Sequence, residues 1–146
     1  MNDNTEKTLD YWINLAKKIA TEAHTGQFRN DKTTPYIKHP EAVANAVDSR
    51  LKPIAWLHDV VEDTHVSIQD LRDAGFPNYI VDAVDAITHR KNDTNVVYWQ
   101  QVLRNADAVE VKIADIKTNL GDAPNDYQKM KYARALKIFA DAGYTV

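Results

Sequence analysis

A chain of 146 residues falls in the usual range for one domain, so residues 1–146 are predicted to form a single domain. The net charge of −3 argues against a nucleic-acid partner, and the absence of cysteine excludes disulfides, thiolate catalysis and thiolate metal sites. No apolar run could span a membrane and no secretory signal is readable, so the sequence favours a cytoplasmic protein without a membrane partner.

Apolar residues spaced by three and four predict amphipathic helices along most of the chain. The first helix covers residues 9–23 with Asn4 or Thr5 as its cap, and residues 26–38 are predicted to be a loop. Further helices are predicted near Pro40 and Pro53 and over residues 67–71, 79–87, 96–103, 109–120 and 127–139.

No stretch shows the sustained alternation of a strand, so the sequence predicts an all-α fold of about eight helices. Residues 109–113 form the one segment that could pass for a strand. The spacing of Ile113, Ile116 and Leu120 favours a helix there instead.

The octet LHDVVEDT at residues 57–64 holds the densest group of side chains that can bind a metal or transfer a proton. On one helix, His58, Asp59, Glu62 and Asp63 stand three or four apart and project from one side. The octet could be a solvated acidic helix end. Its apolar surroundings favour an interior cleft, where buried carboxylates need a partner such as a cation.

Asp115 and His39 are two further candidate metal ligands. Asp115 and Asn119 are four apart, beside the apolar stripe of their predicted helix. His39 directly precedes Pro40, where it is either a residue of the helix start or a ligand. Imidazole and carboxylate groups together suit Mn²⁺, Fe²⁺, Zn²⁺ or Mg²⁺.

The elements YIKHP at residues 36–40, LHDVVEDT at 57–64 and VKIAD at 111–115 occur in this order, followed by Asn119. As a set they resemble the HD-domain superfamily, and within it the RelA/SpoT-type (p)ppGpp hydrolase domain and its small stand-alone relatives. The resemblance implies an all-helical HD bundle with one Mn²⁺ ion, or another divalent cation, as its cofactor. The ligands that it implies are His39, His58, Asp59 and Asp115.

The resemblance also implies a hydrolase in which a metal-bound water removes pyrophosphate from the 3′ position of (p)ppGpp. Glu62 and Asp63 would position and polarise that water, and Asn119 would contact the nucleotide. Cations for the substrate phosphates are expected from Arg29, Lys38, Lys112, Arg90 and Lys91.

Three departures from the family pattern remove positive charge or donors from the substrate side. Asn30 stands where a second basic residue is common, His89 replaces a lysine, and Gly121 replaces an arginine. Another nucleotide, such as a 5′-nucleotide or NADPH, therefore stays open as substrate. A non-catalytic nucleotide-binding regulator also stays open, and the chain could be a monomer or a homodimer.

Overall fold

The computed structural model describes residues 7–146 of the chain. The elements are α1 (Leu9–Ala23), α2 (Lys38–Asn45), the 3₁₀ turn η2 (Ser49–Leu51), α3 (Lys52–Leu57), α4 (Val60–Asp63), α5 (Ile68–Asp73), α6 (Asn78–Ile87), α7 (Asn95–Leu103), α8 (Ala106–Leu120) and α9 (Asp126–Asp141). Within the described range, the only β-type pairing is an isolated bridge between Phe28 and Pro35. The prediction of an all-α fold is confirmed.

The first helix begins one turn later than its predicted caps. The side chain of Thr8 accepts a hydrogen bond from the N–H of Tyr11 and so caps α1, whereas Asn4 and Thr5 lie outside the described residues. Gly26 follows the helix with a φ of +81°, a conformation that side chains disfavour, and turns the chain into the predicted loop.

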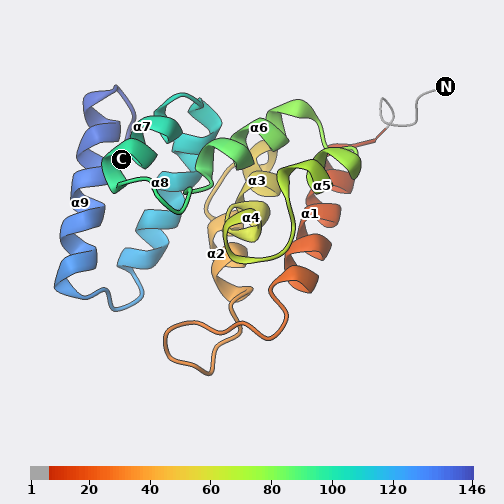
Figure 1. Cartoon of the computed structure of the whole chain (residues 1–146), viewed down its shortest axis with the longest axis horizontal. Coiled ribbons are helices and arrows are strands. Elements are labelled where there is room, and N and C mark those ends of the chain that lie inside the picture. Colours follow the sequence, from red (N-terminus) through yellow and green to blue (C-terminus); the bar gives the residue numbers. More distant parts are fainter. Residues whose placement is uncertain (1–6) are drawn as a thin grey trace.

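The helix α3 lies at the centre of the molecule, between α1 and α2, while α8 and α9 run side by side at one end (Figure 1). Residues 53–57 of α3 are all buried, because this helix is apolar on every side and is enclosed by its neighbours. Its last turn therefore delivers the next residue, His58, into the interior.

The octet does not form the one continuous helix that its spacing predicts, and that prediction is wrong. Helix α3 ends at Leu57 and α4 begins at Val60. The Ala55 carbonyl accepts two hydrogen bonds from His58, one from the backbone N–H at 3.4 Å and one from the ring Nδ1 at 2.6 Å. Both bonds tighten the turn. Consecutive side chains on a regular helix point about 100° apart. The break allows His58 and Asp59 to face the same point.

Residues 109–113, the strand-like segment of the sequence, lie within α8, so the helical prediction is confirmed. Helix α8 is buried along most of one side because it contacts α2, α6, α7 and α9. In the part of the chain that the structure describes, no helix has both the length and the apolar composition needed to cross a membrane.

Candidate metal centre

The predicted ligands come from three parts of the fold and meet in the interior. His39 lies in the first turn of α2, His58 and Asp59 lie at the junction of α3 and α4, and Asp115 lies on α8. Nε2 of His39 is 2.7 Å from Oδ1 of Asp115, and Nε2 of His58 is 3.3 Å from the same oxygen. Nε2 of His58 is also 3.0 Å from Oδ2 of Asp59. Packing thus gathers residues that are up to 76 positions apart.

The bonding of His58 favours a cation at this point. Because a carbonyl only accepts hydrogen bonds, the contact with Ala55 places a hydrogen on Nδ1 of the ring. Nε2 of His58 is buried and makes no hydrogen bond among the described residues, although the carboxylates of Asp59 and Asp115 face it. A lone pair facing two carboxylates is unfavourable, so a positive charge is needed there. Burial alone would lower the pKa of His58, but Asp59 and Asp115 raise it well above its ordinary value, so the charge comes either from a proton on Nε2 or from a metal cation.

The spacing of the donor atoms also suits one ion. One ligand atom each from His39, His58 and Asp115 lies within 4.8 Å of the others, and all three residues are buried. In many metal sites a neutral imidazole donates a hydrogen bond from its second ring N–H to an outer partner, as Nδ1–H of His58 does to the carbonyl of Ala55. These residues could therefore hold one divalent cation.

Both aspartates, Asp115 buried and Asp59 partly buried, are held in the charged form that a ligand requires. Burial alone would raise the pKa of Asp115, but the charges of Lys112 and His58 outweigh it and lower that pKa well below its ordinary value. Burial likewise opposes ionisation of Asp59, yet its contacts with His58 lower its pKa to about 2. Their joint negative charge is what a divalent cation would neutralise.

Glu62 and Asp63 lie on α4, one turn beyond the ligand pair. Glu62 lines a pocket of about 140 Å³ together with His58 and Asp59, and its Oε1 accepts the backbone N–H of His89 at 2.9 Å. Burial, followed by the charges of Asp59 and Glu62, raises the pKa of Asp63 to about 6. A carboxylate with that pKa can exchange a proton near neutral pH.

A larger pocket of about 500 Å³ opens on the other side of His39 and is lined by Arg29, Lys38 and Asn119. Nη2 of Arg29 lies 2.8 Å from Oδ2 of Asp122 and 3.4 Å from Oδ1 of Asn119. This pocket holds three of the side chains predicted to bind substrate.

Lys112 faces the smaller pocket, where its Nζ lies 3.0 Å from Oδ2 of Asp115.

The remaining two predicted cations are not brought to the centre. The guanidinium of Arg90 pairs with Asp85 and also donates to the carbonyl of Thr88 at 2.7 Å. Lys91 is exposed and is not among the residues that line either pocket. The loop after α6 thus turns these two charges outward.

Several residues at the centre escaped the sequence reasoning. Tyr36 donates a hydrogen bond from its hydroxyl to Oδ2 of Asp59, and its closeness in sequence to His39 was the available signal. Lys131 and Tyr132 of α9 line the smaller pocket. No spacing in the sequence points to them, because only the packing of α9 carries them there.

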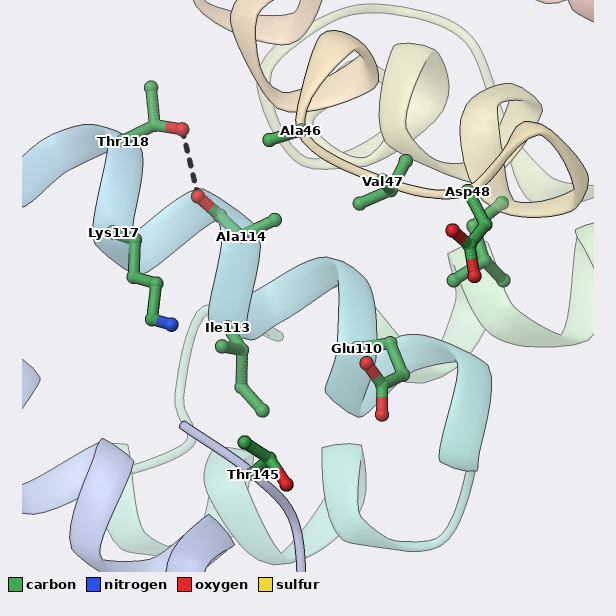
Figure 2. Close-up of a pocket in the computed structure, with 10 residues that line it drawn as sticks. Ala46, Val47, Asp48, Glu110, Ile113, Ala114, Lys117, Thr118 and Thr145 are labelled. Carbon is green, nitrogen blue, oxygen red and sulfur yellow. Dashed lines mark hydrogen bonds between the residues drawn. The ribbon is translucent and has the colours of Figure 1, made fainter.

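A third groove, of about 440 Å³, lies on the far side of α8 (Figure 2). Ile113 and Lys117 line it, and at about 100° per residue they stand on the face of α8 opposite Asp115 and Asn119. The groove is lined by no histidine, and its two carboxylates, Asp48 and Glu110, belong to no group of three possible metal ligands among the described residues. The described residues therefore point to the centre around Asp115 as the candidate site.

The chain is similar to proteins named guanosine-3′,5′-bis(diphosphate) 3′-pyrophosphohydrolase. It is 40% identical over 141 residues to one from Vibrio cholerae, an alignment that covers 84% of this chain and 20% of that protein. It is 31% identical over 120 residues to one from Xenopus tropicalis, called MESH1, with 73% of this chain and 66% of the relative covered. The chain spans about a fifth of the length of the bacterial relatives.

A solved structure described as "A metazoan ortholog of SpoT hydrolyzes ppGpp and plays a role in starvation responses" matches with a TM-score of 0.68. The two chains are 24% identical, and the match covers 84% of this chain and 78% of the other. They therefore share a fold. No family model matches the chain.

Proposed function

The chain belongs to the HD-type family of (p)ppGpp hydrolase domains, and on that premise we propose that it removes pyrophosphate from the 3′ position of (p)ppGpp. The single observation that carries the proposal is the buried convergence of His39, His58 and Asp115, with Nε2 of His58 unbonded between carboxylates. The relatives from Vibrio cholerae and Xenopus tropicalis bear the name of this activity.

His39, His58, Asp59 and Asp115 hold the metal in this proposal, and Mn²⁺ is the ion we propose among the divalent cations that fit. When bound, such an ion acts as a Lewis acid that lowers the pKa of water and offsets charge on the phosphoryl oxygens. Two imidazoles and two carboxylates are a suitable donor set for an ion of this kind.

Glu62 orients the attacking water, and Asp63 takes up its proton. The N–H of His89 holds one oxygen of Glu62, which leaves the other free to accept a hydrogen bond in the pocket beside the ligands. The water oxygen bonds to the phosphorus attached to the ribose 3′ oxygen, the bond between that phosphorus and the 3′ oxygen breaks, and the 3′ oxygen leaves with a proton.

Substrate binding is assigned to both pockets. Arg29, Lys38 and Asn119 contact the nucleotide in the larger pocket, where a guanidinium and an amide can meet a phosphate or a base. Lys112 meets phosphate oxygens in the smaller pocket. Because Arg90 is turned outward to Asp85, it has no place in this proposal, and neither has the exposed Lys91.

A nucleotide screen tests the proposal. Purified protein with added Mn²⁺ is expected to release pyrophosphate from ppGpp with a higher kcat/KM than it shows on 5′-nucleotides or NADPH, and EDTA is expected to stop the release. Ion-exchange chromatography identifies both products. Faster release of orthophosphate from another nucleotide would instead support a phosphatase. Nucleotide binding without any turnover would support a regulator.

Arg29 offers a test of the substrate pocket. Arg29→Ala is expected to raise KM for ppGpp about tenfold, since one charge-assisted hydrogen bond is worth about 1.5–3 kcal/mol, and to leave Mn²⁺ affinity unchanged. Steady-state kinetics at saturating Mn²⁺ measures the effect. Arg50→Ala is the matched control, because Arg50 pairs with Asp107 on the surface. An unchanged KM in Arg29→Ala would remove Arg29 from the binding site.

A further inference from the structure

Tyr36 lies in the loop between α1 and α2, where it contacts the proposed ligand Asp59 and lies beside Arg29, which lines the larger pocket. Its backbone N–H donates to the carbonyl of Gln27 at 2.8 Å, which fixes the residue in the loop. Its hydroxyl meets Asp59, and its ring lies 5.9 Å, centroid to centroid, from that of His39. It is neither one of the proposed metal ligands nor one of the proposed substrate contacts.

The hydroxyl of Tyr36 acts as a donor. Burial and the charge of Asp59 raise the pKa of Tyr36, so the phenol keeps its proton and donates it to Oδ2 of Asp59. Among the described residues, the other close polar contact of the Asp59 side chain is with Nε2 of His58, 3.0 Å from the same oxygen. Asp59 follows the break between α3 and α4, where no regular helix holds its direction. Its orientation therefore depends on these two contacts, and the hydroxyl of Tyr36 supplies one of them.

The ring of Tyr36 serves the other pocket. The guanidinium carbon of Arg29 lies 5.7 Å from the ring centroid, a distance at which a cation is attracted to an aromatic face. The ring of His24 lies 4.9 Å away. His24 is buried, and its Nδ1 is 2.8 Å from Oε1 of Gln27, whose amide donates to the carbonyl of Asp63. These contacts help to hold the Tyr36 ring in place.

We propose that Tyr36 is a positioning residue with two separable effects: its hydroxyl fixes Asp59 as a metal ligand, and its ring fixes Arg29 over the substrate pocket. The inference rests on the proposed function, because it assumes both the metal and the nucleotide. Outer partners of this kind commonly change metal affinity or activity by about 10- to 100-fold when removed.

Two substitutions separate the two effects. Tyr36→Phe keeps the ring and removes the hydroxyl, so it is expected to weaken Mn²⁺ binding about tenfold while KM at saturating Mn²⁺ stays unchanged. Tyr36→Leu removes both groups, and it is expected to weaken Mn²⁺ binding equally and to raise KM roughly threefold. Isothermal titration calorimetry with Mn²⁺ gives the affinity independently of turnover.

The control is Tyr79→Phe, because the Tyr79 hydroxyl also donates to an oxygen, the Arg50 carbonyl at 3.1 Å, but lies away from the centre. This variant is expected to bind Mn²⁺ as the wild type does. A double substitution, Arg29→Ala with Tyr36→Leu, is expected to have the KM of Arg29→Ala alone, since the ring acts through Arg29. Circular dichroism confirms that each variant is folded.

The outcomes are distinguishable. If the wild-type chain does not bind Mn²⁺, the proposed metal site is wrong, and the inference falls with it. If the wild type binds Mn²⁺ and Tyr36→Phe binds it equally well, the role of the hydroxyl is overturned while the proposed function stands. If Tyr36→Leu has the KM of Tyr36→Phe, or if the double substitution raises KM further, the link to Arg29 is overturned.

Discussion

Asp115→Ala is expected to abolish detectable Mn²⁺ binding and to reduce ppGpp hydrolysis to the rate without enzyme. Oδ1 of Asp115 lies close to Nε2 of both His39 and His58, so the substitution removes a central donor and a negative charge. Even outer partners of metal ligands cost about 10- to 100-fold in affinity, and a direct ligand costs more. Calorimetry with Mn²⁺ and pyrophosphate release measure the two losses.

The buried position of Asp115 requires two checks. Its removal leaves the ammonium of Lys112 without its carboxylate partner, so Asp115→Ala also destabilises the fold. Asp115→Asn, which keeps the shape of the side chain, and a thermal unfolding curve separate this effect from metal loss. Asp107→Ala is the matched control, because Asp107 lies on the same helix and pairs with Arg50 at the surface. Turnover that persisted in metal-free Asp115→Ala protein would refute the ligand assignment.

Glu62→Gln is expected to keep the metal and to lose most of the rate. The carbonyl oxygen of glutamine can still accept a hydrogen bond from the N–H of His89, so the side chain stays in place, but the amide can no longer orient the water for proton transfer to Asp63 as a carboxylate does. General acid–base catalysis contributes about 10²–10⁴-fold, and a fall in kcat of that size is expected with little change in Mn²⁺ affinity.

Glu110→Gln is the control for Glu62→Gln. Glu110 lies in the groove on the opposite side of α8, and its substitution is expected to change neither kcat nor Mn²⁺ affinity. If Glu62→Gln lost the metal, Glu62 would be a ligand instead of a water-orienting group. If it kept full kcat, Glu62 would have no part in the reaction.

Local signals in the sequence predicted the helices and part of the site. The spacing of Ile113, Ile116 and Leu120 predicted the helix that carries Asp115, because an apolar stripe must be buried whatever the neighbours are. The adjacent pair His58 and Asp59, in apolar surroundings, indicated an interior site for the same reason, and both residues lie at the candidate centre.

Other features depended on contacts between distant segments. His39 had no local signal beyond the resemblance, since its place beside Asp115 results from the packing of α2 on α8. Arg90 had the right charge and the right neighbourhood in sequence, yet it pairs with Asp85 after the chain leaves α6. Charge alone does not tell which way a loop side chain points.

The sequence by itself determined the all-helical fold and the identity of the groups that suit a divalent cation, because helical periodicity and donor chemistry are properties of short segments. Only the tertiary structure decided that the helix breaks at His58 and Asp59, that Tyr36 contacts Asp59, and that residues of α9 line the smaller pocket. Those features arise from contacts between segments far apart in the chain. The spacing of residues within any one segment therefore does not predict them.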